Sequence, residues 1–565
     1  MISWRRAAGV AATWLWLPIL IGFVWVMSRW LFPGYAADRV IALWVQRWFF
    51  PRGFPTGLNG LPGWLWFWVA ANLAISAIIL GSDYRVPVWQ GWLAGILAVL
   101  AAVVLFGPFV TAVWDNDKDL GRFYDRAAVV HVPSISDPPA SVTSLLNGAR
   151  PGRGGCVRMG RHDVPACIKV DNDYSAMRWE SRTSGLASAR TAMTQAASQA
   201  QGVDVMAASM VYVWGDRPDT GQWAAILDGS GDHQPLYGVA QWDGESNATT
   251  VCRFTGDHKL NRAFNGTGMN DMKHWLAEKY PKLFWSAQDL RGYCSGNRPV
   301  IAIAVQRQIA YKNRTVQVPA GDLLLRGTPD GGPDVTYMKD VKPGDLPVPA
   351  YPIGTTRIQR DATAWLAGRV NKQNSFGFQT STFETQKDNP GEYFLRGQDH
   401  RLYYVTPLTP RGTQSQAFVA YGVVAADQVH DGRLNTYNLY VLATGDPMIA
   451  NLAALNAKAS LIGAQNGANL EGYIPLGADR WRVYGVRNGQ TVFYINLSVN
   501  DQLQPETVMS GASGESPSQQ APPPSQSPQP TTTTDCGKPP AQLDNKQLAR
   551  CLADLGDELR RRNGG

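Results

Sequence analysis

Uncharged apolar stretches dominate the first fifth of the chain. Residues 7–28, 53–82 and 86–114 carry no charged side chain. Each stretch can supply the roughly 20 consecutive apolar residues that a membrane-spanning helix requires. The pattern therefore predicts a multi-span α-helical membrane anchor over residues 1–114. The three predicted transmembrane helices are about 10–31, 64–81 and 92–113.

A signal peptide is the alternative interpretation of the first stretch. Its apolar run is longer and richer in tryptophan than a signal peptide requires, and no small-residue cleavage site follows it. We therefore expect the first helix to be retained. Thirteen of the 21 tryptophans precede residue 115, as expected where amphipathic rings settle at the depth of lipid headgroups.

The distribution of charge argues against a nucleic-acid partner. The chain has a net charge of +7, but residues 1–114 hold seven arginines and two aspartates, which leaves only +2 for the other 451 residues. Most of the excess positive charge therefore flanks the predicted spans. A protein that binds nucleic acid would instead carry a basic patch on its aqueous domain.

All six cysteines lie after the predicted anchor. They are Cys156, Cys167, Cys252, Cys294, Cys536 and Cys551. An even number confined to one compartment is typical of disulfides formed in an oxidising space. Neighbours in sequence suggest the pairs 156–167, 252–294 and 536–551, although six cysteines allow about 15 pairings. Metal binding is the alternative, but the sequence has no C-x-x-C or Cys/His cluster with zinc spacing.

The rules for membrane orientation disagree. Arg5 and Arg6 favour a cytoplasmic N-terminus, whereas the arginines of the first loop and the basic residues after the third predicted span slightly favour the reverse. The cysteines decide between the two. We expect a multi-pass protein of the cell membrane with its N-terminus in the cytoplasm and its large C-terminal region outside.

The aqueous part divides by composition into five segments. Residues 115–176 are rich in Pro, Gly and Ser and resemble a stalk or irregular collar. Two α+β domains are predicted at 177–345 and 346–508. Residues 509–535 form a Pro/Ser/Gln/Thr-rich linker that cannot bury a core. Residues 536–565 are predicted to form a short disulfide-stapled helix.

Helical and strand-like patterns alternate after residue 176, which indicates a repeated unit of one helix packed on an antiparallel sheet. The predicted helices are 185–201, 269–280, 358–370 and 446–459. The predicted strands are 205–214, 299–307, 315–325, 402–406, 417–424, 437–443, 481–487 and 490–499. Asn488-Gly489 between the last two strands is a strong hairpin signal, because both turn positions need positive φ. Such a unit leaves one sheet face free for a partner.

No residue pattern identifies a catalytic, cofactor or metal site. The densest polar cluster is 228–233, D-G-S-G-D-H, which we interpret as a turn, because adjacency in a glycine loop does not orient a nucleophile and its base. Carboxylates for glycan cleavage are candidates only by residue type. They are Glu180, Glu245, Glu278 and Glu384. We predict no catalytic, cofactor-binding or metal-binding residue.

Two stretches carry a resemblance. Gly292-Tyr293-Cys294 with 311–327 (Y-K-N-R-T-V-Q-V-P-A-G-D-L-L-L-R-G), and 402–412 (L-Y-Y-V-T-P-L-T-P-R-G) leading into F-V-A-Y-G-V-V, resemble uncharacterised membrane proteins of actinobacteria and their mobile elements. The units over about 355–500 resemble PepSY-type or cystatin-like modules of extracytoplasmic proteins. The resemblance implies no catalytic residue.

These observations lead to one functional expectation and two alternatives. We expect a non-enzymatic, membrane-anchored extracytoplasmic protein that binds or organises a partner in the cell envelope. Its partners would be the lipid bilayer and an envelope protein or polymer, with a homo-oligomer as a further possibility. The first alternative is a cell-envelope enzyme acting on glycan or peptide. The second, by analogy of layout alone, is a component of a secretion or conjugation apparatus.

Overall fold

A computed structural model describes most of the chain up to residue 509. The described ranges are 4–31, 63–81, 88–109, 121–134, 150–151, 157–158, 167–170, 174, 177–182, 184–215, 221–229, 234–244, 249–266, 270–311, 314–363, 378–380, 392–410, 417–443, 452–498 and 506–509. They all belong to one compact unit, Met1–Ala512. The predicted linker and C-terminal helix, with Cys536 and Cys551, lie outside the described residues.

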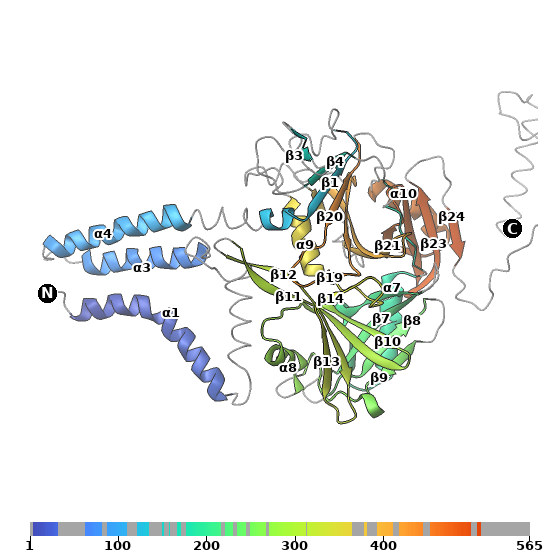
Figure 1. Cartoon of the computed structure of the whole chain (residues 1–565), viewed down its shortest axis with the longest axis horizontal. Helices are drawn as coiled ribbons and strands as arrows, with labels where there is room; N and C mark the ends of the chain where they lie inside the picture. The colour runs from blue at the N-terminus through green and yellow to red at the C-terminus, as the bar shows by residue number, and fades with distance from the viewer. Residues whose placement is uncertain are drawn as a thin grey trace, which may run out of the picture. The chain divides into compact units, whose positions relative to one another are not determined.

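The described residues of the apolar N-terminal region include three helices and one π-helical turn (Figure 1). They are α1 (Trp4–Leu31), α3 (Gly63–Gly81), α4 (Val88–Val104) and η2 (Leu105–Phe109). Within the described residues, two helical stretches are long and apolar enough to cross a membrane, Trp64–Gly81 and Val88–Gly107.

The prediction of a three-span anchor is therefore wrong. The span expected at 64–81 matches α3, and the span expected at 92–113 begins four residues earlier, at Val88. Among the described residues, the apolar helical stretch found in α1 is Ala7–Leu20, which falls short of the roughly 20 residues that a span requires. Freedom from charge over residues 7–28 was therefore not sufficient to define a span.

The aqueous region is α+β, as predicted, and repeats the order of one helix followed by antiparallel strands. Besides the helical residues 121–125, the described part of this region contains α7 (Leu186–Ser198), α8 (Met272–Lys279), α9 (Ile353–Ala362) and α10 (Leu452–Gln465). Asp271 caps α8 by accepting hydrogen bonds from the backbone N–H groups of Lys273 and His274, which satisfies donors that a helix leaves unpaired at its start.

Two antiparallel sheets follow α7 and α8. The first contains β5 (Val203–Val205), β6 (Val211–Trp214), β7 (Gly221–Gly229), β8 (Gly238–Trp242) and β9 (Thr250–Arg253). The second contains β10 (Leu290–Ser295), β11 (Arg298–Tyr311), β12 (Arg314–Gly327) and β13 (Pro333–Met338). Three short 3₁₀ turns accompany these strands: η4 (Ala207–Ser209) lies between β5 and β6, η5 (Gly256–His258) follows β9, and η7 (Ala287–Asp289) precedes β10.

The single strand predicted at 205–214 is interrupted by η4. The Ser209 hydroxyl accepts a hydrogen bond from the backbone N–H of Ile226, at 2.9 Å. The Ser209 hydroxyl thus accepts from β7 a hydrogen bond that a backbone carbonyl of a neighbouring strand would otherwise accept. The backbone of residues 207–209 can therefore leave the sheet. The strands predicted at 299–307 and 315–325 are confirmed within the longer β11 and β12.

The largest sheet described has nine strands and combines residues from the start of the aqueous region, 128–170, with residues 378–441. Its strands are β15 (Phe378–Thr380), β16 (Tyr393–Arg396), β17 (Leu402–Pro410), β18 (Ala420–Ala425), β20 (Tyr437–Val441), β1 (Ala128–Val132), β4 (Cys167–Val170), β3 (Val157–Arg158) and β2 (Arg150–Pro151). A separate pair joins β14 (Asp340–Val341) to β19 (Val429–His430).

Strand β1 lies inside the segment expected to be an irregular stalk. It pairs in parallel with β20 on one side and with β4 on the other. Val130 and Val132 are fully buried, as is usual for a parallel strand covered on both faces. A five-residue apolar run among Pro, Gly and Ser is too short to reveal such a strand by periodicity.

The last unit matches its prediction most closely. Strands β21 (Asn469–Pro475), β22 (Arg480–Arg487), β23 (Gln490–Ser498) and β24 (Glu506–Met509) form an antiparallel meander in sequence order. Asn488 and Gly489 have φ of 53° and 78°, so the predicted hairpin turn is confirmed. Leu455 and Ala459 of α10 are buried, and the start of the predicted helix, before Leu452, lies outside the described residues.

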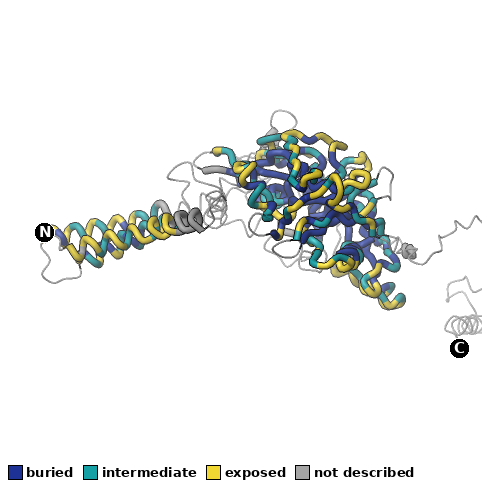
Figure 2. Tube along the Cα trace, turned by 90° about the horizontal axis from the view of Figure 1, so that it is seen from below, coloured by how far each residue is buried: buried dark blue, intermediate teal, exposed yellow. Residues whose placement is uncertain are grey.

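Two hydrophobic clusters hold the sheets together. The larger one includes residues of β1, β7, β17, β20 and β22, and the smaller one lies between α8 and the β10–β13 sheet. Because the larger cluster contains residues from both predicted α+β domains, a boundary at residue 345 does not separate two cores. Figure 2 shows the buried residues concentrated in the β-rich region, whereas the N-terminal helices carry a mixture of exposed, intermediate and buried residues, with exposed ones prevailing along α4.

Candidate functional site

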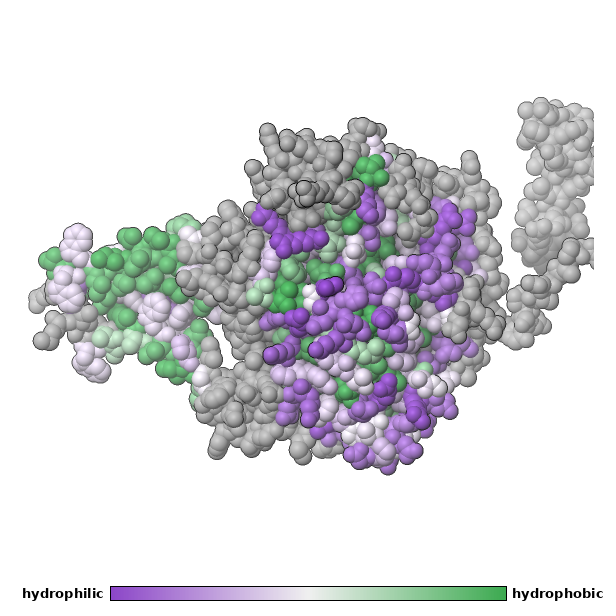
Figure 3. All heavy atoms as spheres, viewed as in Figure 1, coloured by the Kyte–Doolittle hydropathy of each residue, from purple (hydrophilic) through white to green (hydrophobic). Residues whose placement is uncertain are grey.

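The most distinctive surface of the molecule is apolar and belongs to the N-terminal helices. Among the side chains that the structure describes, the exposed large hydrophobic ones all lie in α1, α3, α4 or η2, with the exceptions of Val170 and Leu461. Figure 3 shows this hydrophobic surface beside the mainly hydrophilic surface of the sheet region. An apolar surface of this kind marks a membrane or protein interface.

The burial of α3 and α4 distinguishes them from the core helices of a water-soluble protein. Only 28% of the Trp64–Gly81 window and 17% of the Val88–Gly107 window are buried. The outward residues include Ile78, Trp92 and Val99. Helices that are apolar yet uncovered by their own chain are those that lipid can cover.

Polar side chains in this region point inward. Asn72 and Ser76 of α3 are buried, and Ser76 accepts a hydrogen bond from the indole N–H of Trp14 in α1, at 3.1 Å. The ring of Trp14 also meets that of Trp68 edge-on, with centroids 5.5 Å apart. Hydrogen bonds and aromatic contacts of this type join helices in an apolar solvent, where hydrophobic burial cannot.

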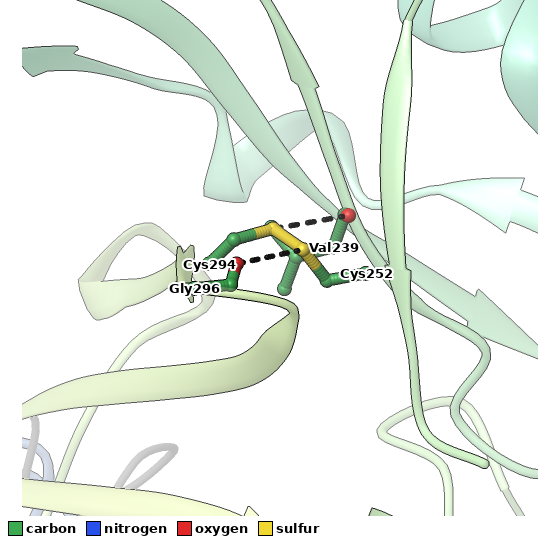
Figure 4. Close-up of a disulfide and its surroundings, with 4 residues drawn as sticks. All are labelled: Val239, Cys252, Cys294 and Gly296. Atoms are coloured by element: carbon green, nitrogen blue, oxygen red, sulfur yellow. Dashed lines mark hydrogen bonds between the residues drawn. A yellow bond between two sulfur atoms is a disulfide. The ribbon is translucent and has the colours of Figure 1, made fainter.

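A disulfide joins the two sheets that follow α7 and α8. Cys252 of β9 and Cys294 of β10 are bonded, with their Cα atoms 6.1 Å apart, as the sequence predicted. The carbonyl oxygens of Gly296 and Val239 lie 3.8 Å from the two sulfurs (Figure 4). Cys167 is also disulfide-bonded, but Cys156 lies outside the described residues. The described part of the chain therefore has no free cysteine.

Beside this disulfide the two sheets approach closely. A Cβ atom at Gly292 of β10 would lie 2.9 Å from side-chain atoms of Ile226 and Val239, in β7 and β8. Only glycine fits without displacement at this distance. Gly292 and the Cys252–Cys294 bond thus fix the same sheet-to-sheet contact, one by shape and one covalently.

A cluster of buried ionisable groups lies where β10, β12, β17 and the start of α9 meet. Asp289, Arg291 and Asp322 are all buried. Asp289 accepts hydrogen bonds from the hydroxyl of Ser286, at 2.6 Å, and from the backbone N–H of Ile353, at 3.0 Å. Asp289 therefore orders the first turn of α9. The Arg291 guanidinium donates to the carbonyl of Ala208 at 2.8 Å.

Asp322 differs from its neighbours because neither carboxyl oxygen has a hydrogen-bond partner among the described residues. Burial raises the pKa of Asp322 well above its usual range, and the nearby Asp289 carboxyl raises it further. Burial also raises the pKa of Asp289, although its hydrogen bonds oppose the change. The neutral acid is the form of Asp322 that such surroundings favour.

Other buried charges are paired and connect separate elements. Glu392, whose side chain is fully buried, binds both Arg357 and Arg360 of α9. Arg182 donates to the carbonyl of Phe394 at 2.5 Å and lies over the ring of Trp223, 5.0 Å from its centroid. Burial lowers the pKa of the Arg182 guanidinium. Paired, inaccessible charges of this type position elements rather than meet a substrate.

Among the described residues, those that the sequence singled out do not converge on a reaction centre. Asp228 is buried at the end of β7 and accepts hydrogen bonds from the backbone N–H groups of Phe264 and Asn265; burial raises its pKa to about 6. Glu180 pairs with Arg396 at 2.5 Å, and Glu278 lies on α8. Residues 230–233, Glu245 and Glu384 lie outside the described residues. Over the described ranges, no three His, Cys, Asp or Glu side chains are placed to hold a metal ion.

Sequence reasoning did not identify the Asp289–Asp322 cluster. Asp322 lies in V-P-A-G-D-L-L-L, where one acid interrupts an otherwise apolar strand. A charged residue within a continuous apolar run is a usable signal, because such a residue is buried if the strand is covered on both faces. Its partners, by contrast, come from distant parts of the chain.

Comparison with known proteins finds no matching family model, no matching curated protein and no matching solved structure. The resemblances to actinobacterial membrane proteins and to PepSY-type modules therefore stay predictions.

Proposed function

We propose that this chain is a membrane-anchored, non-enzymatic protein whose extracytoplasmic β-rich region binds or organises a partner in the cell envelope. The observation that carries the proposal is the combination of outward-facing apolar helices α3 and α4 with a disulfide-bonded aqueous region. Lipid is the solvent that suits the helices, and an oxidising compartment is where such disulfides persist.

The two-helix anchor alters the expected topology. An even number of spans returns the chain to the side from which it entered, so the segments before Gly63 and after Phe109 face the same compartment. In the proposal this compartment lies outside the cytoplasm, and the loop 82–87, which contains Asp83 and Arg85, faces the cytoplasm.

Reporter fusions test this topology. Alkaline phosphatase fused after residue 512 should be active, and the same enzyme fused after residue 85 should be inactive, because it folds only where disulfides form. Activity after residue 85 together with inactivity after residue 512 would place the β-rich region in the cytoplasm and refute the proposal.

The non-enzymatic part of the proposal is supported by what these ionisable groups do. Asp228, Asp289, Glu180 and Glu392 are occupied with backbone or arginine partners inside the fold, so these acids serve the architecture. A membrane-impermeant amine crosslinker applied to intact cells should convert the full chain into a discrete larger species. A second polypeptide in that species supports the proposal, whereas a chain that stays monomeric at every crosslinker concentration contradicts it.

A further inference from the structure

The first helical turn after the anchor packs on the end of the long β11–β12 hairpin. Residues 121–125 are helical, and the ring of Phe123 lies 5.0 Å from that of Tyr311, the last residue of β11. The guanidinium carbon of Arg126 lies 4.9 Å from the centroid of the Tyr311 ring. The hydroxyl of Tyr124 donates to the carbonyl of Gln317 in β12, at 2.7 Å. We call Arg122, Phe123, Arg126 and Tyr311 the Tyr311 cluster.

The composition of the Tyr311 cluster suits a lipid headgroup region. Phe123, Tyr311 and Arg122 are half-buried and Arg126 is exposed. The neighbouring acid, Asp125, is fully buried, and burial raises its pKa well above the usual range, so it offsets little of the arginine charge. Aromatic rings with adjacent arginines are enriched at the depth of lipid headgroups, and arginine attracts anionic lipid.

The chain itself holds this cluster near the bilayer. Only residues 110–120 separate the end of η2 from Gly121, and a chain of that length spans at most about 40 Å when fully extended. Tyr311 shares this restraint, because it is far from the anchor in sequence but in contact with Phe123. The hairpin adds Arg314 directly opposite Tyr311 in the register of the two strands.

From this geometry we infer that the Tyr311 cluster is a second membrane contact, which binds anionic phospholipid headgroups and so orients the β-rich region on the bilayer surface. The inference rests on the proposed membrane anchorage. Three aspartates, Asp115, Asp117 and Asp119, precede the cluster in sequence. The attraction must therefore come from the cluster's own arginines, and the test isolates their contribution.

Photocrosslinking from the full-length protein in vesicles provides the test. Tyr311 is replaced by benzoylphenylalanine, an aromatic photocrosslinker of similar shape, and lipid adducts are measured by mass spectrometry. Vesicles contain either phosphatidylcholine alone or phosphatidylcholine with phosphatidylglycerol. The matched control carries the same amino acid in place of Tyr494, a half-buried tyrosine of β23 that also lies against an arginine, Arg482.

The expected result is a lipid adduct at position 311 and none at position 494, with a higher yield in the anionic vesicles. Arg122→Gln and Arg126→Gln should each lower the anionic yield by roughly fivefold. No adduct at position 311, or equal yields in the two kinds of vesicle, would overturn the inference. Extraction with alkaline carbonate separates this outcome from failure of the anchor: a protein that stays in the membrane but forms no adduct refutes only the headgroup contact.

Discussion

The N-terminal helices and the β-rich region solve opposite solvation problems. In α3 and α4 the large apolar side chains face outward and Asn72 and Ser76 are buried, whereas in the sheets Val130, Ile303 and Leu439 are fully buried and most of the visible surface is hydrophilic (Figure 3). Apolar side chains therefore face outward in one segment of the chain and inward in the other. The difference teaches that burial alone does not define a core, because the surrounding solvent decides which side chains belong inside.

Of the changes considered, a charge on the outward face of α4 should have the largest effect, because it should reduce insertion of this helix into lipid. Ile96 is 54% exposed, and Ile96→Arg near the middle of a span is expected to cost about 3–4 kcal/mol of insertion free energy. The fraction of protein retained in the membrane after alkaline carbonate extraction measures the effect. The control is Leu461→Arg in α10, where an equally outward leucine, 71% exposed, faces water. Equal losses for both variants would contradict the assignment of α4 to lipid.

Removing the disulfide should produce the next largest effect, and only in the β-rich region. Cys252 and Cys294 are 42 residues apart in sequence. A crosslink that closes such a loop stabilises the folded state by about 4 kcal/mol, because it reduces the conformational entropy of the unfolded chain. Cys252→Ser combined with Cys294→Ser should lower the urea midpoint of the detergent-solubilised protein accordingly. Membrane retention should not change. If the double variant unfolds at the wild-type urea concentration, the bond has no structural role.

Gly292→Ala tests the close contact between β10 and the β7–β8 pair. The added methyl would lie 2.9 Å from Ile226 and Val239, and overpacking of this kind typically costs about 1–3 kcal/mol. Gly332→Ala is the matched control, since its Cβ would have only ordinary contacts, the nearest at 3.4 Å. Thermal unfolding of both variants should show a loss for the first and little change for the second. If Gly332→Ala lost more thermal stability than Gly292→Ala, the two sheets would not be closely packed at Gly292.

The smallest expected effect concerns pH and Asp322. A carboxyl whose pKa is raised on folding binds more protons in the folded state, so its contribution is fully favourable below the unfolded pKa, near 4, and is lost as pH rises through the folded pKa. Unfolding free energy should therefore fall between pH 5 and pH 8. Asp322→Asn should reduce that fall, because an amide does not titrate, by on the order of 1 kcal/mol for each unit by which folding raises the pKa of Asp322.

The variant should keep part of the pH dependence, because burial raises the pKa of Asp125, Asp228 and Asp289 as well. Asp289, Tyr293 and Tyr404 are the titratable groups that interact with Asp322. Asp334→Asn on β13, which removes an exposed carboxyl, is the control and should leave the wild-type slope intact. A slope that is unchanged by Asp322→Asn would show that Asp322 stays ionised in the fold.

Local signals determined much of this architecture from the sequence alone. The apolar character of 64–81, the Asn488-Gly489 turn and the strands around 299–325 were all predictable, because span length, positive φ and apolar runs depend on residues that are neighbours in sequence. The pairing of Cys252 with Cys294 was also predicted, although sequence proximity alone could not exclude the other pairings.

Only the tertiary structure decided the features that depend on distant segments. It placed Ala128–Val132 between two parallel partner strands. Cys167, which pairs with Val129, lies 38 residues further along the chain, and Tyr437, which pairs with Ala128, lies 309 residues further along. It also brought Phe123 against Tyr311 and Asp289 against the start of α9. Such contacts form when the entropy lost on loop closure is offset by the free energy gained from burial in a shared core. The hydrophobic periodicity of one segment does not specify which distant segment completes that core.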